Sequence, residues 1–140
     1  MIREPRPGEL PAVERLQGLL PEPAPELLND AAGGSVLVST AAGPGGRERV
    51  VGYLLWFPGE PVSVAEVVVE PAHRREGRGR RLFQALFDRF PDNTEVTLRV
   101  AADNEGAIRL YRELGFERVA TIPDAYESGA GYRMRVVTGG

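Results

Sequence analysis

Residues 67–86, VVVEPAHRREGRGRRLFQAL, decide the expected fold. An apolar strand ends at Pro71, a loop rich in glycine and arginine follows, and an amphipathic segment comes next. Apolar residues in and after that segment recur at the i, i+3, i+4 and i+7 spacing of one buried helical face, namely Phe83, Leu86, Phe87 and Phe90. The stretch therefore predicts a buried strand, a loop, and a helix that begins near Gly77 or Gly79.

The loop between this strand and this helix has the composition of an anion site. A helix start offers N–H groups without intrahelical partners, together with the positive end of the helix dipole. Gly77 and Gly79 let the backbone approach a phosphate closely, because neither carries a Cβ. Positive charge comes from five neighbouring arginines, Arg74, Arg75, Arg78, Arg80 and Arg81. These features indicate a binding site for a small anionic ligand.

The loop departs from two better-known phosphate-binding motifs. A P-loop needs a Lys-Ser/Thr pair, which the loop lacks, and a dinucleotide fingerprint needs a third glycine three residues after GRG. A glycine-containing turn with solvated arginines stays open on the spacing alone. His73 is the only histidine in the sequence, so we expect no metal site and place it at the surface or beside the phosphate.

Upstream of the loop, the pattern alternates between strands and helices. Residues 2–3 predict a short strand, and a helix follows Pro7-Gly8 with Leu10, Val13, Leu16 and Leu20 on its apolar face. Residues 21–30 predict a second, shorter helix with Pro25 in its first turn. Three strands are expected next, at 35–40, 49–57 and 62–70, the first two joined as a hairpin by the turn at 41–46.

Downstream, residues 95–100 alternate as a strand and a helix begins near Asn104. Its apolar face carries Ala107, Leu110, Tyr111 and Leu114, and Gly115 is placed as a left-handed stop. Strands at 116–122 and 132–137 complete the order βααβββαβαββ. The fold class is therefore α/β, a mixed twisted sheet of six to seven strands with about four helices on its faces.

Composition favours one globular domain over residues 1–140. Hydrophobic residues make up 42% and charged residues 26%, and the absence of cysteine excludes disulfides, thiolate metal sites and a cysteine nucleophile. No apolar run reaches the roughly 18 residues of a membrane span, and the opening MIREPRPGEL does not read as a signal peptide. We therefore expect a cytoplasmic protein without membrane contact. The net charge of −3 argues against nucleic-acid binding.

Two motifs resemble those of the GNAT superfamily of N-acetyltransferases. RREGRG at 74–79, after a strand that ends in Val-x-Pro, is similar to the family's pyrophosphate motif. NEGAIRLYRELGF at 104–116 is similar to the family's second motif, Asn-x-x-Ala-x-x-x-Tyr-x-x-x-Gly-Phe. The opening residues 2–16 also resemble the usual start of such proteins. Together these stretches span nearly the whole chain, and the resemblance implies a GNAT-like fold.

The resemblance implies acetyl-CoA as co-substrate. Its pyrophosphate is expected on the loop, formed by Arg74, Arg75, Glu76, Gly77, Arg78, Gly79 and Arg80. Its pantetheine arm is expected to pair with the backbone of Val67, Val68 and Val69, where an N–H near Val68 would stabilise the oxyanion. Asn104 either bonds near the pantetheine or caps its helix. Arg75, Glu76 and Arg78 depart from the residues that the family often has there, which leaves open which arginine contacts which phosphate.

The resemblance also assigns catalytic roles. Glu66 is the candidate base, since it interrupts an apolar strand beside the expected thioester. Its alternative is a strand carboxylate that faces solvent or a neighbouring arginine. Tyr111 is the candidate acid that protonates the departing thiolate, and its alternative is a half-buried tyrosine on the helix stripe.

The acceptor is a primary amine, with candidate contacts at Tyr53, Trp56 and Tyr126. Tyr53 and Trp56 have core or rim positions as their alternative. The spacing of Tyr126, Gly129 and Met134 is similar to that of protein N-terminal acetyltransferases, while a small-molecule amine stays equally open. A non-catalytic acyl-CoA-binding module is the competing class. Relatives often pair through sheet edges, so a homodimer through the strand at 132–137 is a further expectation.

Overall fold

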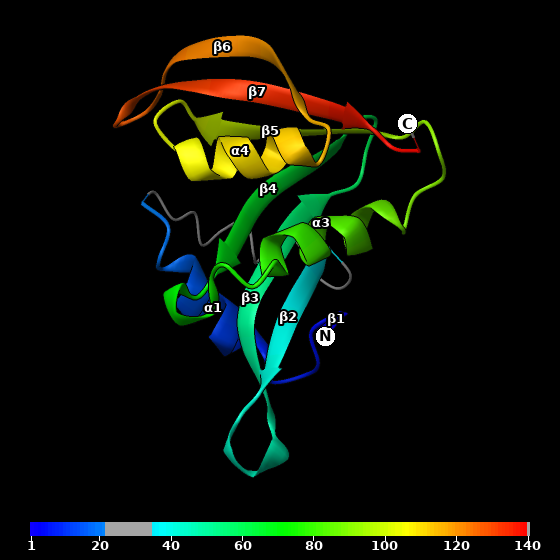
Figure 1. The fold of residues 1–140 in the computed structure, drawn as a ribbon, viewed down its shortest axis with the longest axis vertical. Helices are drawn as coiled ribbons and strands as arrows, with labels where there is room; N and C mark the ends of the chain where they lie inside the picture. Colours follow the sequence, from blue (N-terminus) through cyan, green and yellow to red (C-terminus); the bar gives the residue numbers. More distant parts are fainter. Residues whose placement is uncertain (22–34, 140) are drawn as a thin grey trace. The chain divides into compact units, whose positions relative to one another are not determined.

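The computed structural model describes residues 1–21 and 35–139, and Figure 1 shows its helices and strands. The elements in chain order are β1 (Ile2–Arg3), α1 (Leu10–Gln17), β2 (Val36–Ala42), β3 (Glu48–Phe57), β4 (Val62–Val69), α3 (Arg78–Phe87), β5 (Glu95–Ala101), α4 (Glu105–Glu113), β6 (Glu117–Tyr126) and β7 (Gly129–Val137). Every described β-strand and α-helix matches an expected one. The second helix expected after Pro21 lies outside the described residues.

The strands form one seven-stranded mixed sheet in the order β1-β2-β3-β4-β5-β7-β6. β4 and β5 are parallel, and the β2–β3, β5–β7 and β6–β7 pairs are antiparallel. The strand expected at a sheet edge, residues 132–137, is β7, which pairs with β5 on one side and β6 on the other. That expectation was wrong, because the hairpin folds its second strand inward and leaves β6 at the edge.

The chain divides into two compact units. The first contains Met1–Phe57 and Glu66–Arg89, and the second contains Pro58–Ala65 and Phe90–Gly140. β4 contributes its first four residues to the second unit and the rest to the first.

In the first unit, α1 and α3 cover opposite faces of the strands (Figure 1). On one face, Val13 and Leu16 of α1 pack into a cluster with strand residues that include Val38. The neighbouring Ser39 points the other way, toward α3, as alternation along a strand requires. The fully buried residues of α3 are Leu82, Phe83 and Leu86. Phe83 and Leu86 belong to the expected apolar face, and Leu82 does not. The helix ends at Phe87, so Phe90 is not on it.

In the second unit, local signals set both ends of α4. The side chain of Asn104 accepts a hydrogen bond of 3.2 Å from the backbone N–H of Ala107, and this caps the helix. Gly115 has φ +99°, the left-handed conformation expected of the stop. Ile108 and Phe116 are the buried residues here, whereas the stripe expected on the helix is only partly buried. β6 and β7 extend beyond the predicted strands because they pair as far as Tyr126 and Gly129.

Candidate active site

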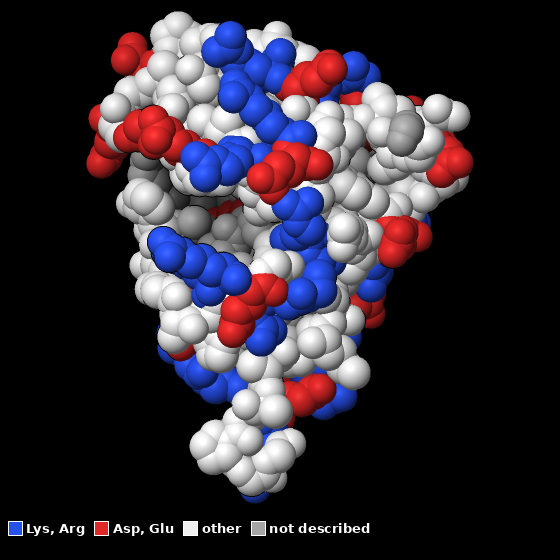
Figure 2. Space-filling view, in the orientation of Figure 1, with Lys and Arg blue, Asp and Glu red and all other residues white. Residues whose placement is uncertain are grey.

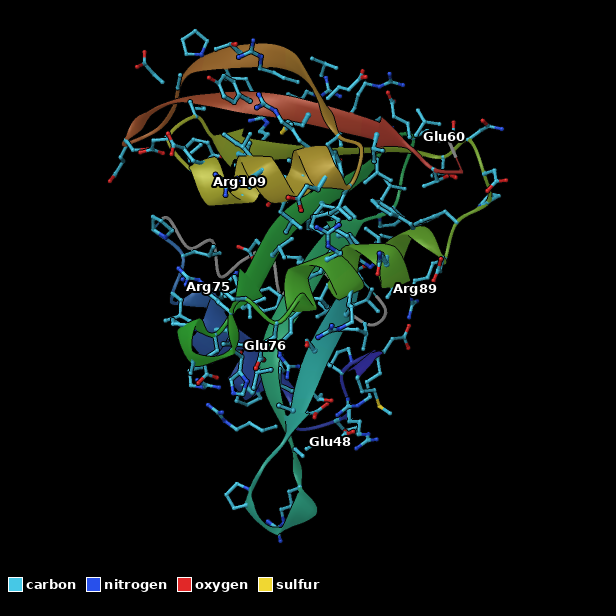
Figure 3. All side chains as sticks on the ribbon, viewed as in Figure 1. Glu48, Glu60, Arg75, Glu76, Arg89 and Arg109 are labelled. Atoms are coloured by element: carbon cyan, nitrogen blue, oxygen red, sulfur yellow. The ribbon has the colours of Figure 1, made fainter. Side chains whose placement is uncertain are left out.

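The loop between β4 and α3 has an unusual backbone. After β4, a short 3-10 turn (Pro71–His73) leads to Arg75 at φ +66° and Gly77 at φ +74°. Figure 3 labels Arg75 and Glu76 on this loop. Left-handed φ is costly for a residue with a Cβ, and such conformations cluster at ligand sites. Arg75 therefore adopts a backbone conformation that an arginine does not favour by itself.

α3 begins directly after Gly77, which has no side chain to cap it. The first helical hydrogen bond of this turn runs from Arg81 N–H to the Gly77 carbonyl at 3.0 Å. N–H groups of a helix's first turn point out of its N-terminus, where the helix dipole favours an anion. The loop expected from the sequence thus has the geometry of an anion cradle at the start of a ten-residue helix.

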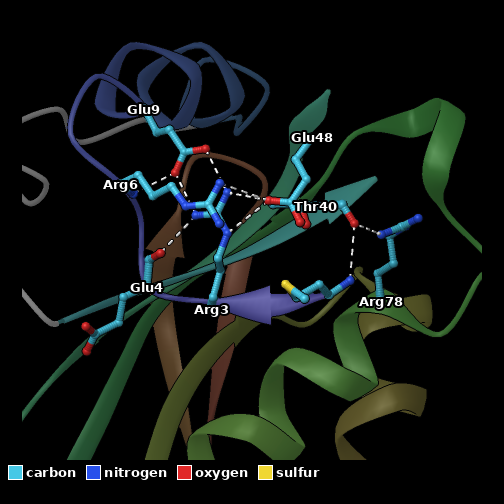
Figure 4. Close-up of polar contacts among 8 residues, drawn as sticks. Arg3, Glu4, Arg6, Glu9, Thr40, Glu48 and Arg78 are labelled. Carbon is cyan, nitrogen blue, oxygen red and sulfur yellow. Dashed lines mark hydrogen bonds and ion pairs between the residues drawn. The ribbon is translucent and has the colours of Figure 1, made fainter. Parts of the chain in front are cut away.

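Two of the loop arginines, Arg74 and Arg78, donate hydrogen bonds to other residues of the protein. Arg78 donates to Glu76 at 2.8 Å, to the Ser39 hydroxyl at 3.0 Å and to the Thr40 carbonyl at 3.1 Å. Figure 4 shows the bond from Arg78 to Thr40. The hydrogen bond from Arg78 lowers the pKa of Glu76. Arg74 donates to the Val69 carbonyl at 2.9 Å, at the end of the strand expected to receive the pantetheine.

The side chain of Arg75 is exposed. Arg75 is therefore better placed than Arg78 to meet a phosphate with its guanidinium, and Arg78 is better placed to fix the start of α3 on β2. Figure 2 shows acidic and basic side chains interspersed on the face that it draws.

Glu66 lies in a buried polar cluster on β4. It is 7% exposed, and it accepts hydrogen bonds from Gln17 Nε2 to both carboxylate oxygens, at 3.0 and 3.2 Å. The hydroxyl of Tyr53 donates to Glu66 Oε1 at 3.0 Å. The alternative that Glu66 faces solvent is wrong, because β4 turns the residue to the same side as the buried Val64 and Val68.

Tyr53 is a core residue whose hydroxyl donates a hydrogen bond to Glu66. Its side chain is fully buried and belongs to the cluster beneath α1. Burial, together with the charge of Glu66 and the hydrogen bond to it, raises the pKa of the Tyr53 hydroxyl well above its ordinary value. Tyr53 therefore stays protonated and donates. Trp56, three residues on, is partly buried, and its backbone N–H donates to the Ser35 carbonyl at 2.9 Å.

Gln17 was missed by the sequence analysis. It is the last residue of α1 and is 2% exposed. In the sequence, Gln17 is a polar residue directly after the apolar Leu16. Such a residue more often lies at a solvent-exposed helix end, so the sequence did not indicate its burial.

Tyr111 lies on α4 in the second unit, where its ring contacts Phe116 with centroids 5.8 Å apart. Burial, with a smaller contribution from Tyr126, raises the pKa of Tyr111 to about 12. The phenol therefore carries its proton across the neutral range, as a general acid must. Asn104, a candidate for the cofactor, is bonded as the α4 cap.

The sequence around this site matches a known protein family. The model of the "Acetyltransferase (GNAT) family" matches residues 9–116. This chain belongs to that family. The matched range contains the loop and both candidate catalytic residues, Glu66 and Tyr111.

Individual relatives are similar over part of the chain. The N-alpha-acetyltransferase RimI of Mycobacterium tuberculosis is 43% identical over 75 residues, which is 52% of this chain and 47% of that protein. A [ribosomal protein bS18]-alanine N-acetyltransferase of Salmonella typhimurium is 30% identical over 80 residues, 56% of this chain and 54% of that protein. The chain thus spans about half the length of these curated relatives.

A solved structure, Ard1 from Thermoplasma volcanium, is similar over the full fold. It has a TM-score of 0.81 at 27% identity and covers 98% of this chain and 96% of its own. Among residues 1–21 and 35–139, no helix has the length and apolar character needed to cross a membrane. The same residues contain no group of three or more His, Cys, Asp or Glu side chains arranged to hold a metal ion.

Proposed function

We propose that this protein transfers the acetyl group of acetyl-CoA to a primary amine. The observation that carries the proposal is the loop within the family region, where left-handed residues at Arg75 and Gly77 lead into the uncapped start of α3. Such a cradle suits a pyrophosphate, because backbone N–H groups and the helix dipole both favour a doubly charged anion. Arg75 adds an exposed guanidinium there.

The amine nitrogen attacks the thioester carbonyl carbon, an amide bond forms, and the carbon–sulfur bond breaks. Glu66 takes the proton that the amine loses, directly or through a water, and Tyr111 gives its proton to the sulfur. Tyr111 holds this proton at neutral pH, because burial raises the pKa of its hydroxyl. Val67–Val69 are proposed to pair with the pantetheine, and an N–H near Val68 to stabilise the oxyanion.

The acceptor that we propose is the N-terminus of a protein. Support comes from the two relatives named as N-alpha- and bS18-alanine acetyltransferases. An α-amine has a pKa near 8, so a sizeable fraction is already neutral at physiological pH. Tyr126 on β6, with Trp56, is proposed to border the acceptor site. A small-molecule amine is the competing acceptor.

Calorimetric titration with acetyl-CoA tests the loop. The parent should bind in the micromolar range, and Gly77→Ala should weaken binding about tenfold or more, because a Cβ at φ +74° reshapes the cradle. Gly8→Ala is the matched control: Gly8 has φ +86° and no atom within 4 Å of an added Cβ, so its backbone cost is similar. Absence of binding in the parent would refute the proposal, as would equal binding by Gly77→Ala and the parent.

Acetyl transfer then separates the acceptors. Peptides with N-terminal alanine are compared with their N-blocked forms and with a polyamine, by mass spectrometry. The chain contains no lysine, so self-acetylation at lysine adds no background. Transfer to the free peptide alone supports the protein N-terminus, and transfer to the polyamine alone supports a small-molecule acceptor. Binding without any transfer would favour the non-catalytic module.

A further inference from the structure

We propose that Gln17 on α1 and Tyr53 on β3 are positioning residues, which hold the Glu66 carboxylate in one orientation for proton transfer. This inference rests on the proposed function, because it gives Glu66 the role of base. It assigns to Gln17 a function that its sequence context did not indicate. It also replaces the contact with the acceptor expected of Tyr53 by an action through Glu66.

The geometry fixes the carboxylate from two sides. Gln17 Nε2 reaches both oxygens, at 3.0 and 3.2 Å, and Tyr53 Oη reaches Oε1 at 3.0 Å. A carboxylate is an acceptor only, so both partners must donate for these bonds to form. All three side chains are buried, at 2%, 0% and 7% exposed for Gln17, Tyr53 and Glu66. Rotation of the carboxylate would therefore break bonds where little water can replace them.

Both donors to Glu66 are uncharged groups, and this suits a carboxylate that acts as a base. Gln17 faces Glu66 from α1 as a neutral amide, and Tyr53 faces it from β3 as a phenol. Neutral donors favour the charged carboxylate, which offsets its desolvation, but they depress its proton affinity less than an arginine ion pair would. Tyr53 stays a donor at every pH of an assay, because its pKa is raised. Neither of these two donors changes its charge in the pH range of the assay.

The same cluster also ties α1 to the sheet, and a purely structural role has different consequences. If the bonds only stabilise the fold, Tyr53→Phe and Gln17→Met would lower the melting temperature without altering the pH dependence of turnover. If the bonds position the base, removing a donor also changes the pKa and the orientation of the Glu66 carboxylate. The acidic limb of the pH profile is the fall in kcat/KM at low pH, where the base becomes protonated. A purely structural role would leave the position of that limb unchanged.

The experiment measures pH profiles of acetyl transfer to the acceptor peptide. Tyr53→Phe and Gln17→Met should each lower kcat about tenfold and move the acidic limb up by about one pH unit, the amount expected for one hydrogen bond to a charged group. Tyr132→Phe on β7 and Gln84→Met on the exposed face of α3 are the matched controls. Each makes the same chemical change away from Glu66 and should leave the profile in place.

A double-mutant cycle with Glu66→Gln shows whether the residues act through Glu66. In the Glu66→Gln background, Tyr53→Phe should have little further effect on kcat, whereas independent roles would give additive losses. Unmoved acidic limbs in both variants, or additive losses in the cycle, would overturn the inference while the parent still transfers acetyl groups. A parent that transfers no acetyl group would instead overturn the proposed function, and the inference with it.

Discussion

The substitution Glu9→Gln should make the protein less stable at neutral pH and leave its stability at strongly acidic pH unchanged. Glu9 precedes α1, the helix that carries Gln17, and it accepts two hydrogen bonds from the Arg3 guanidinium at 2.7 and 2.9 Å (Figure 4). The N–H of Arg6 also donates to Glu9 at 2.6 Å. Arg3 in turn bonds to Glu48 on β3 at 3.0 Å, so this network anchors the start of α1 to the sheet.

The magnitude follows from the pKa of Glu9. The hydrogen bonds from Arg3, followed by the backbone bond from Arg6, outweigh burial and lower this pKa from 4.5 to about 2. At about 1.36 kcal/mol per unit, the full shift would correspond to about 3.4 kcal/mol. The side chains of Arg3 and Glu9 are 14% and 20% exposed, so solvent screening reduces the expected contribution to about 1–2 kcal/mol.

The sign sets the pH window. Because the folded pKa is depressed, the stabilisation is complete above the unfolded pKa near 4.5 and disappears as pH falls through about 2. Urea unfolding, followed by the fluorescence of Trp56, the only tryptophan, gives the free energy at each pH. The parent should exceed Glu9→Gln by about 1–2 kcal/mol at pH 7, and the gap should close toward pH 2.

Glu14→Gln, at an exposed position of the same helix, is the control and should change stability little at any pH. A gap between the parent and Glu9→Gln that is the same at pH 7 and pH 3 would refute the electrostatic reasoning. So would the absence of a gap at pH 7.

Two further substitutions test the second unit. Tyr111→Phe should lower kcat roughly 10²-fold or more without changing acetyl-CoA affinity, because the proton donor is lost and the ring is kept; an unchanged single-turnover rate would contradict the role as acid. In Gly131→Ala the new Cβ would lie 2.7 Å from Tyr126 Cε2, so the tyrosine ring must move. The KM for the acceptor peptide should rise and the calorimetric affinity for acetyl-CoA should stay, with Gly106→Ala, which meets no atom within 4 Å, as control.

Much of the fold was predictable because its signals are local. Gly77 and Gly115 have the positive φ that a turn requires, and Asn104 caps the helix that it precedes. Apolar periodicity located α3 and α4 because a helix buries one face. The loop was predictable for the same reason: its glycines and arginines lie within a few residues of each other.

The candidate site was predictable only in part. Tyr111 could be named from its motif and Glu66 from its place in an apolar strand, but the residues that contact them could not be predicted. Arg78 is one of the loop residues expected near the pyrophosphate, and its guanidinium bonds to Ser39 and Thr40 on β2. No sequence pattern reveals this, because the partners are about 39 residues apart and come together only when α3 packs on the sheet.

The sequence by itself determined the order of the described strands and helices, the start of α3 and both ends of α4, since each depends on neighbouring residues. Only the tertiary structure decided that β7 is interior and β6 the edge, and that Gln17 meets Glu66. The physical reason is that a buried hydrogen bond depends on which surfaces pack together. Gln17 and Glu66 are 49 residues apart, and it is the packing of α1 on the sheet that brings the amide to the carboxylate.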